Sequence, residues 1–445
     1  MVAHAGGVVE EVAEFLLGLV FLDAFEGVFA DGGLDAVDVA VVEVFESGGE
    51  PFVFAVAQHE FQGHGTPSIE GTAEPGFEQV AAEFERLLAT EQDARGQFCA
   101  YHCGRRVVDL WGGDEVSGDD LQGVFSSTKG ASAICIALLV ERGVLGLDEP
   151  VARYWPEFAA GGKEAVTVRV ALSHQAGLAG LEPQLTIDEM LDHPLVAERL
   201  AAAVPAWRPG TAHGYHALTI GTLMDELTRR TVGIPIADLF RVEIGDPRGI
   251  DVYIRSPPEA DGRVKPVLPL RPNPEQQREL DARGGRAPDS LSGMAFNAVT
   301  RPATELLPNI PEVRRSGQAA AAAVCSARGL ARLYAMCVGE VDGLPRILSP
   351  KTVEAVTQIQ TVGDDLILRC PTRYGIVFQK ADDRLPFGSH QAFGHDGAGG
   401  SVGVADPWHD VGYAWIPRRM SFPGGGDLRG LGLAQNLRDC LPPQP

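Results

Sequence analysis

Lysine and arginine are absent from the first 65 residues of this 445-residue chain. The same stretch contains 12 acidic residues, about half of the chain's net charge of −23. It contains none of the sequence motifs described below. We therefore interpret residues 1–65 as an acidic extension outside a single domain at residues 66–440. The sequence leaves open whether this extension belongs to the native protein.

Long hydrophobic runs are also missing. The most apolar run of the N-terminal stretch, "FLLGLVFL" (15–22), is far too short to cross a bilayer. It lacks the basic segment that opens a signal peptide, so no targeting signal is recognised and we expect a cytoplasmic protein. The excess of acidic over basic residues argues against nucleic acid or an anionic membrane as the main partner.

Cysteines are few and scattered. Of the seven, only Cys99 and Cys103 lie close together, in "FCAYHC". The alternation of this segment is typical of a strand, which predicts that both thiols share one face. No second Cys/His pair lies nearby, so ordinary reduced cysteines are favoured over a metal site.

What the sequence does contain is the periodicity of an α/β (α+β) protein with ample apolar material for a large core. Helical spacing appears in residues 77–89 and 326–337, whereas "QFCAYHCGRRVVDLWGG" (97–113) reads as two strands around a Cys-Gly turn. Residues 374–415 have strand-and-turn character. The Pro-, Arg- and Gly-rich residues 255–290 look like an excursion from this domain rather than a separate one.

A serine and one of only five lysines stand together in "GVFSSTKGASAICIALLVERG" (123–143). Ser126 and Lys129 precede a run that is apolar on all sides, which predicts a central, buried helix ending at Gly143. Positions i and i+3 share a helix face, so the amine can reach the hydroxyl. A buried amine loses affinity for protons and can activate a serine nucleophile, while the free N–H at the helix start can bind an oxyanion.

Two later motifs complete a pattern. Tyr215 follows a Pro-Gly turn in "RPGTAHGYHA", and "FGHDGAGGSVG" begins at Phe393. Together with "SSTK" they resemble, in order and separation, the motifs of the penicillin-recognising serine hydrolases, and most of all the class C β-lactamase-like esterases called family VIII carboxylesterases. The resemblance covers residues 70–435. It implies a β-lactamase/transpeptidase-like fold, an antiparallel sheet flanked by helices plus a mostly helical region.

By this resemblance, Ser126 attacks an ester carbonyl and forms an acyl-enzyme. Lys129 and Tyr215 together remove the serine proton and pass it to the leaving alcohol. The N–H groups of Ser126 and Ala398 form the oxyanion hole, and water then hydrolyses the acyl-enzyme. The implied partner is a small-molecule ester, with no metal or organic cofactor and an undefined oligomeric state.

Departures from the β-lactamase pattern favour short-chain esters as substrates. Ala217 occupies the position where β-lactamases have the asparagine of Y-x-N. His395 replaces the lysine of K-T-G, which binds the carboxylate of a β-lactam. A neutral imidazole suits an uncharged ester better. The resemblance places His395 and Gly397 in the substrate pocket, although His395 could instead be a structural histidine bonded to the backbone.

Several alternatives stay open. The chain could be a β-lactamase, a D-aminopeptidase-type hydrolase or a non-catalytic scaffold of the same fold, and Ser126 could merely cap its helix. Ser401 lies in "GGSVG", which fits the G-x-S-x-G elbow of α/β-hydrolases. That elbow needs a strand, a turn and then a helix, whereas the residues after Ser401 predict strands and a turn.

Overall fold

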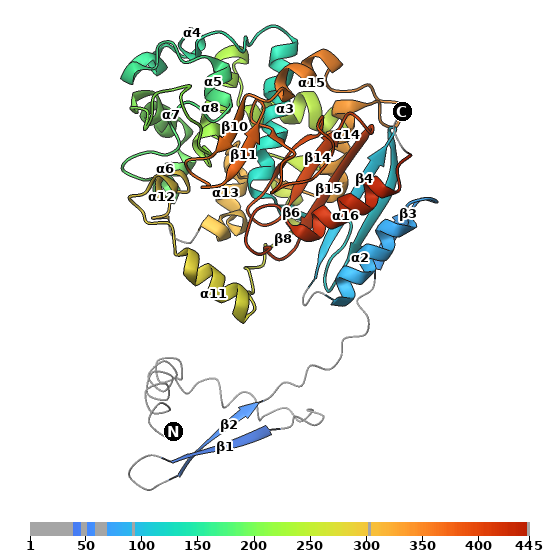
Figure 1. Ribbon diagram of the computed structural model, residues 1–445. Coiled ribbons are helices and arrows are strands. Elements are labelled where there is room, and N and C mark those ends of the chain that lie inside the picture. The colour runs from blue at the N-terminus through green and yellow to red at the C-terminus, as the bar shows by residue number, and fades with distance from the viewer. Residues whose placement is uncertain (1–38, 46–50, 58–68, 91–93, 301–303, 443–445) are drawn as a thin grey trace. The chain divides into compact units, whose positions relative to one another are not determined.

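The computed structural model describes residues 39–45, 51–57, 69–90, 94–300 and 304–442 (Figure 1). The chain divides into two compact units, residues 1–65 and 66–445. The described part of the first unit is a hairpin of β1 (Val39–Phe45) and β2 (Pro51–Ala57), paired antiparallel along their whole length. The other elements belong to the second unit.

A nine-stranded antiparallel sheet forms the centre of the second unit. Its strands, in spatial order, are β10 (Thr361–Asp364), β11 (Pro371–Tyr374), β12 (Gln379–Lys380), β13 (Phe393–Asp396), β14 (Val402–Asp406), β15 (Val411–Pro417), β4 (Gly96–His102), β5 (Arg105–Gly112) and β3 (Ile69–Ala73). The expected strand pair around a Cys-Gly turn is β4 and β5, and the predicted strand-and-turn segment, residues 374–415, supplies β12 to β15. Both predictions are confirmed.

The prediction that Cys99 and Cys103 share one strand face is wrong. Strand β4 ends at His102, and Cys103 lies in the following turn with a φ of 48°. The pairing of β4 with β5 also shifts register between Ala100 and Tyr101. Cys99 is therefore buried in the core, whereas Cys103 is exposed.

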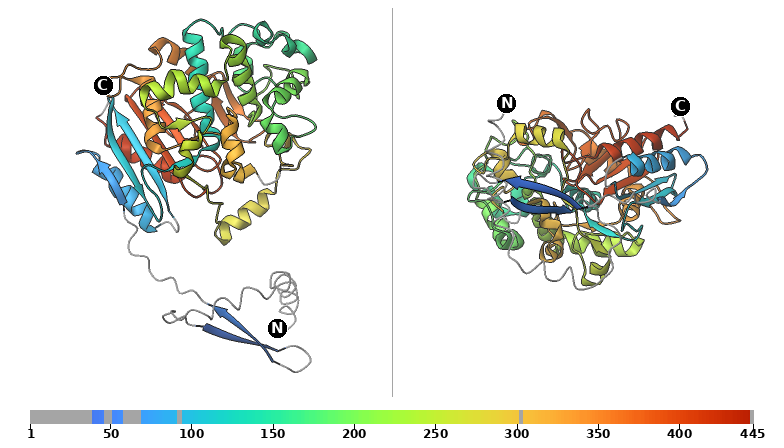
Figure 2. Two further views of the ribbon diagram at one scale, coloured as in Figure 1. Left: turned by 180° about the vertical axis from the view of Figure 1, so that it is seen from behind. Right: turned by 90° about the horizontal axis from the view of Figure 1, so that it is seen from below.

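Helices cover both faces of the sheet (Figures 1 and 2). Helices α2 (Glu78–Thr90) and α16 (Leu428–Asp439) pack on one face, in an apolar cluster that contains Phe98. Helix α14 (Ala327–Val338) packs on the other face, in the cluster that contains Cys99. Neighbouring residues of β4 thus point into different cores, as the two-residue period of a strand requires.

Helix α3 (Thr128–Glu141) connects the sheet to the helical region. It contacts strand β13 and the helices α8 (Thr219–Val232), α9 (Ile236–Phe240) and α15 (Pro350–Thr357). Its residues from Thr128 to Leu139 are all buried. The prediction of a central buried helix is confirmed, and Gly143 follows its end with a φ of 69°.

The remaining elements are short. The helical region and its connections comprise α4 (Val151–Tyr154), α5 (Val168–Leu172), α6 (Ile187–Leu191), α7 (His193–Ala202), α10 (Asp246–Arg248), α11 (Pro274–Arg283), α12 (Leu291–Ala295) and α13 (Pro311–Ser316). A small sheet has the order β7 (Val252–Tyr253), β9 (Val324–Cys325), β6 (Leu121–Gly123) and β8 (Val264–Lys265). Among the described residues, no helix is long and apolar enough to cross a membrane.

Candidate active site

The turn that carries Ser126 joins strand β6 to helix α3. It is a single 3₁₀ turn, Phe125–Ser127. Phe125 has a φ of 47°, a left-handed conformation that is uncommon outside glycine and often found at functional sites. Ser126 is partly exposed, whereas Phe125 and Ser127 on either side are buried. The turn therefore presents one hydroxyl from an otherwise closed segment.

The Ser126 hydroxyl is not used as a helix cap. Residue Ser127 holds the N-cap position of α3 and makes no side-chain capping bond. The Lys129 amine instead donates to Ser126 Oγ over 2.9 Å. The i,i+3 contact expected from the sequence is present, and the capping alternative is not supported.

Lys129 is completely buried. Besides Ser126, its Nζ donates to the backbone carbonyls of Ala217 over 2.7 Å and Ala320 over 3.1 Å. Burial lowers the pKa of Lys129 to about 7, although the Asp396 carboxylate acts in the opposite direction. A neutral amine is therefore well populated near pH 7, and its lone pair can accept the serine proton.

Tyr215 also contacts the Ser126 hydroxyl and lies close to Lys129. The Lys129 Nζ is 4.9 Å from the centroid of its ring. Burial and the negative charge of Asp396 raise the pKa of Tyr215, and its hydrogen bond with Ser126 acts to lower it. The phenol thus keeps its proton at neutral pH, so it can donate a proton while the amine accepts one.

Ala217, at the position of the missing asparagine, still contributes to the site. It has no side-chain amide to offer a substrate, yet its backbone carbonyl makes the shorter of the two carbonyl contacts to Lys129. Only tertiary structure could reveal this role, because a backbone carbonyl leaves no signature in the residue type.

The end of strand β13 lies against the turn that carries Ser126. A Cβ added to Gly397 would meet the carbonyl oxygen of Val124 at 2.2 Å, so a larger residue could not approach this closely. The next residue, Ala398, packs against the apolar cluster that contains Phe125. Within the described part of the chain, no hydrogen bond uses the Ala398 N–H, which leaves it available to an oxyanion.

Ser401 does not sit in a nucleophile elbow. Strand β14 follows it, where an elbow requires a helix. The side chain is buried, donates to the Val124 carbonyl over 2.9 Å and lies 3.0 Å from Ser127 Oγ. Ser401 therefore ties the turn that carries Ser126 to the sheet.

His395 is fully buried, and its ring centroid lies 6.1 Å from that of Tyr215. Its Nδ1 is 2.7 Å from the backbone carbonyl of Asp396, which makes Nδ1 the donor of that bond. Burial, followed by the charge of Lys129, lowers the pKa of His395 to about 3. The imidazole is neutral at pH 7 and provides no positive charge for a substrate carboxylate.

Asp396 is a residue that the sequence analysis did not assign to the site. Burial by itself would raise its pKa, but the Arg384 guanidinium and other partners hold it below the usual value. The carboxylate accepts bonds from Gln379 Nε2 over 2.8 Å and from the Gly426 N–H over 2.7 Å. Its negative charge acts on both Lys129 and Tyr215. The signal available in the sequence was an acidic side chain within the segment predicted to form strands.

This fold and site define a serine hydrolase of the penicillin-recognising type. The chain belongs to the β-lactamase family, whose sequence profile matches residues 80–435. It is 35% identical over 390 residues to the esterase/β-lactamase LipL of Mycobacterium tuberculosis, covering 83% of this chain and 87% of LipL.

Solved structures agree. EstA from Arthrobacter nitroguajacolicus Rue61a superposes with a TM-score of 0.78 at 39% identity, over 83% of this chain and 97% of EstA. A family VIII carboxylesterase gives a TM-score of 0.76 at 30% identity, over 84% and 100% of the two chains. The family and the β-lactamase/transpeptidase-like fold expected from the sequence are confirmed.

Proposed function

We propose that this chain is a carboxylesterase that hydrolyses short-chain carboxylic esters through an acyl-enzyme on Ser126. Relatives named as an esterase/β-lactamase and as a family VIII carboxylesterase, at 35% and 30% identity, confirm the class of serine ester hydrolase. The proposal of an acyl-enzyme on Ser126 rests on one observation. The Ser126 hydroxyl is hydrogen-bonded both to the buried Lys129 amine, whose pKa is about 7, and to the protonated phenol of Tyr215.

Acylation begins when Ser126 Oγ attacks the ester carbonyl carbon and its proton passes to the neutral Lys129 amine. The N–H groups of Ser126 and Ala398 stabilise the negative charge that develops on the carbonyl oxygen. As the tetrahedral intermediate collapses, the C–O bond to the alcohol breaks. The leaving oxygen takes the Tyr215 proton, which Lys129 replaces.

Deacylation reverses these roles. A water molecule attacks the acyl carbon and gives its proton to the Tyr215–Lys129 pair. Collapse of the second intermediate breaks the bond to Ser126 Oγ, which recovers a proton, and the carboxylic acid leaves. The pair ends with the same protons that it had at the start, so each turnover consumes only water and ester.

The polar groups of the site favour an ester over a β-lactam. A charge-assisted bond to a substrate carboxylate is worth roughly 1.5–3 kcal/mol. The neutral, buried His395 cannot provide it, and Ala217 has no side-chain donor.

A fluorophosphonate probe and two matched serine variants test the proposal. The probe phosphonylates an activated serine with loss of fluoride. We expect labelling and p-nitrophenyl butyrate hydrolysis in the wild type and in Ser401→Ala, and neither in Ser126→Ala. Ser401→Ala loses buried hydrogen bonds, so its free energy of unfolding should fall by about 1–3 kcal/mol. An inactive but folded Ser401→Ala beside an active Ser126→Ala would refute the assignment.

A further inference from the structure

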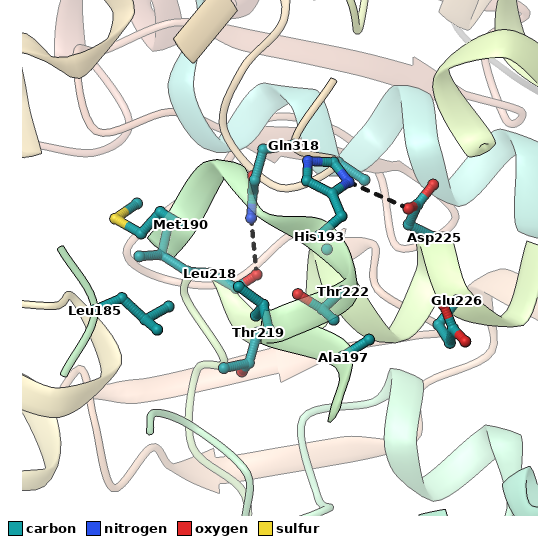
Figure 3. Close-up of a pocket in the computed structure, with 13 residues that line it drawn as sticks. Leu185, Met190, His193, Ala197, Leu218, Thr219, Thr222, Asp225, Glu226 and Gln318 are labelled. Carbon is teal, nitrogen blue, oxygen red and sulfur yellow. Dashed lines mark hydrogen bonds and ion pairs between the residues drawn. The ribbon is translucent and has the colours of Figure 1, made fainter. Parts of the chain in front are cut away.

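Two apolar cavities lie next to each other near the nucleophile turn. The first cavity, whose space of about 490 Å³ includes open solvent, is lined by Phe125, Leu191, Leu218, Leu307, Pro308 and Ala322, among others. The second cavity lies between α7 and α8, and its space of about 530 Å³ also includes open solvent (Figure 3). It is lined by Leu185, Val196, Ala197, Thr222 and Asp225, among others. Apolar atoms make up most of the lining surface of both.

The first cavity adjoins the turn that carries Ser126. Its wall includes Phe125, the residue immediately before the nucleophile. The segment leading to Ala323 runs along the same turn. The Val124 N–H donates to the Ala323 carbonyl, and the Ala323 N–H donates to Thr128 Oγ1, each over 3.0 Å. The two residues before Ala323 line the cavity, so the cavity borders two segments that lie next to Ser126 in the fold.

Gln318 separates the two cavities. Together with Met190 and Leu218, it lines both of them. Its Nε2 donates to the Leu218 carbonyl over 3.0 Å (Figure 3), and its Oε1 accepts from the Ala320 N–H over 2.8 Å. Held by both ends of its amide, the side chain forms a fixed partition.

The acyl part of an ester fits the first cavity better than the alcohol part does. Tyr215 protonates the leaving oxygen, so the alcohol must lie on the Tyr215 side of the nucleophile. Tyr215 packs in a different apolar cluster, beside Tyr374 and Phe296. None of these three aromatic residues lines either cavity.

We propose that the first cavity holds the acyl chain of the substrate and that Gln318 sets the longest chain it accepts. This inference rests on the proposed esterase function and specifies its substrate class: linear acyl chains that end at the partition. Each additional CH₂ that enters the cavity should raise kcat/KM about fourfold, equivalent to about 0.8 kcal/mol. The rise stops at the chain length that reaches Gln318.

The test is a series of p-nitrophenyl esters from acetate to dodecanoate, assayed with the wild type and with Gln318→Ala and Gln318→Leu. Alanine joins the cavities, so the optimum should move at least two carbons longer, with a gain of at least about tenfold over butyrate for the new optimum. Leucine removes the same hydrogen bonds but keeps a side chain of similar size, so its optimum should stay that of the wild type. Adding Thr222→Phe to Gln318→Ala refills the second cavity and should restore the shorter optimum.

Ratios of kcat/KM between esters separate a change in acyl-chain preference from a general loss of catalytic activity. Displacing Ala320, which holds Lys129, would lower the turnover of all esters by a common factor and leave the optimum unmoved. An unchanged optimum in a folded Gln318→Ala overturns the inference and leaves the esterase proposal intact. A shift in preference along butyrate esters of longer alcohols, with none along the acyl series, also overturns it. No hydrolysis of any ester by the wild type would overturn the esterase proposal, and this inference with it.

Discussion

Replacing Lys129 by methionine removes a buried amine and leaves an apolar side chain of similar length. In the folded protein, burial lowers the pKa of this amine from the ordinary value of 10.5 to about 7. The unfolded chain therefore binds more protons than the folded chain between pH 7 and 10.5. The wild type must gain stability as the pH rises through this window, by about 1.4 kcal/mol per pH unit and about 5 kcal/mol in all.

The assay is the free energy of unfolding of the wild type and Lys129→Met, measured by denaturant titration from pH 6 to 10. Subtracting the two curves removes the titration of other groups. We expect the difference to be constant below pH 7, where Lys129 is protonated in both states, and to change in favour of the wild type above it. The carbonyls of Ala217 and Ala320, which lose their donor, add an offset of about 1–3 kcal/mol each that does not depend on pH.

Kinetics provide the second readout. The kcat/KM of the wild type for p-nitrophenyl butyrate should rise with pH to a plateau, with its midpoint near 7, because only the neutral amine accepts the Ser126 proton. Lys129→Met should lower kcat by about 10²–10⁴-fold. A stability difference that stays flat from pH 7 to 10 would show that the folded protein retains the lysine proton, which would refute its role as the base.

Three further predictions follow from the site and the sequence. Tyr215→Phe should lower kcat by about 10²–10⁴-fold with little change in KM, and combining it with Lys129→Ala should cost far less than the sum of both losses; additive losses would mean that the residues act separately. Because His395 is neutral, kcat/KM for p-nitrophenyl butyrate should exceed that for any penicillin by at least about a hundredfold, or about 2.7 kcal/mol, and equal values in a side-by-side assay would contradict this. Deleting residues 1–65 should leave ester turnover and cooperative unfolding nearly unchanged, whereas loss of folding would place the domain boundary elsewhere.

The order of neighbouring residues was enough to predict the features that depend on residues close together in the chain. The all-round apolar run after Lys129 predicted the buried helix α3, and the i,i+3 spacing predicted the contact with Ser126. Three ordered motifs predicted the family, and with it the place of Tyr215, which is 89 residues from Ser126 in sequence and close to it in space. The residues after Ser401 predicted a strand context, which the structure has.

Tertiary structure alone decided what depends on distant neighbours. The pKa of Lys129 follows from complete burial and from Asp396, 267 residues away, because desolvation and charge act through space rather than along the chain. The same holds for the burial of His395. Strand alternation misplaced Cys103 because the turn begins one residue earlier than the pattern shows. Gln318 is an unremarkable glutamine in the sequence, and it becomes a partition only where the fold brings two cavities to either side of it.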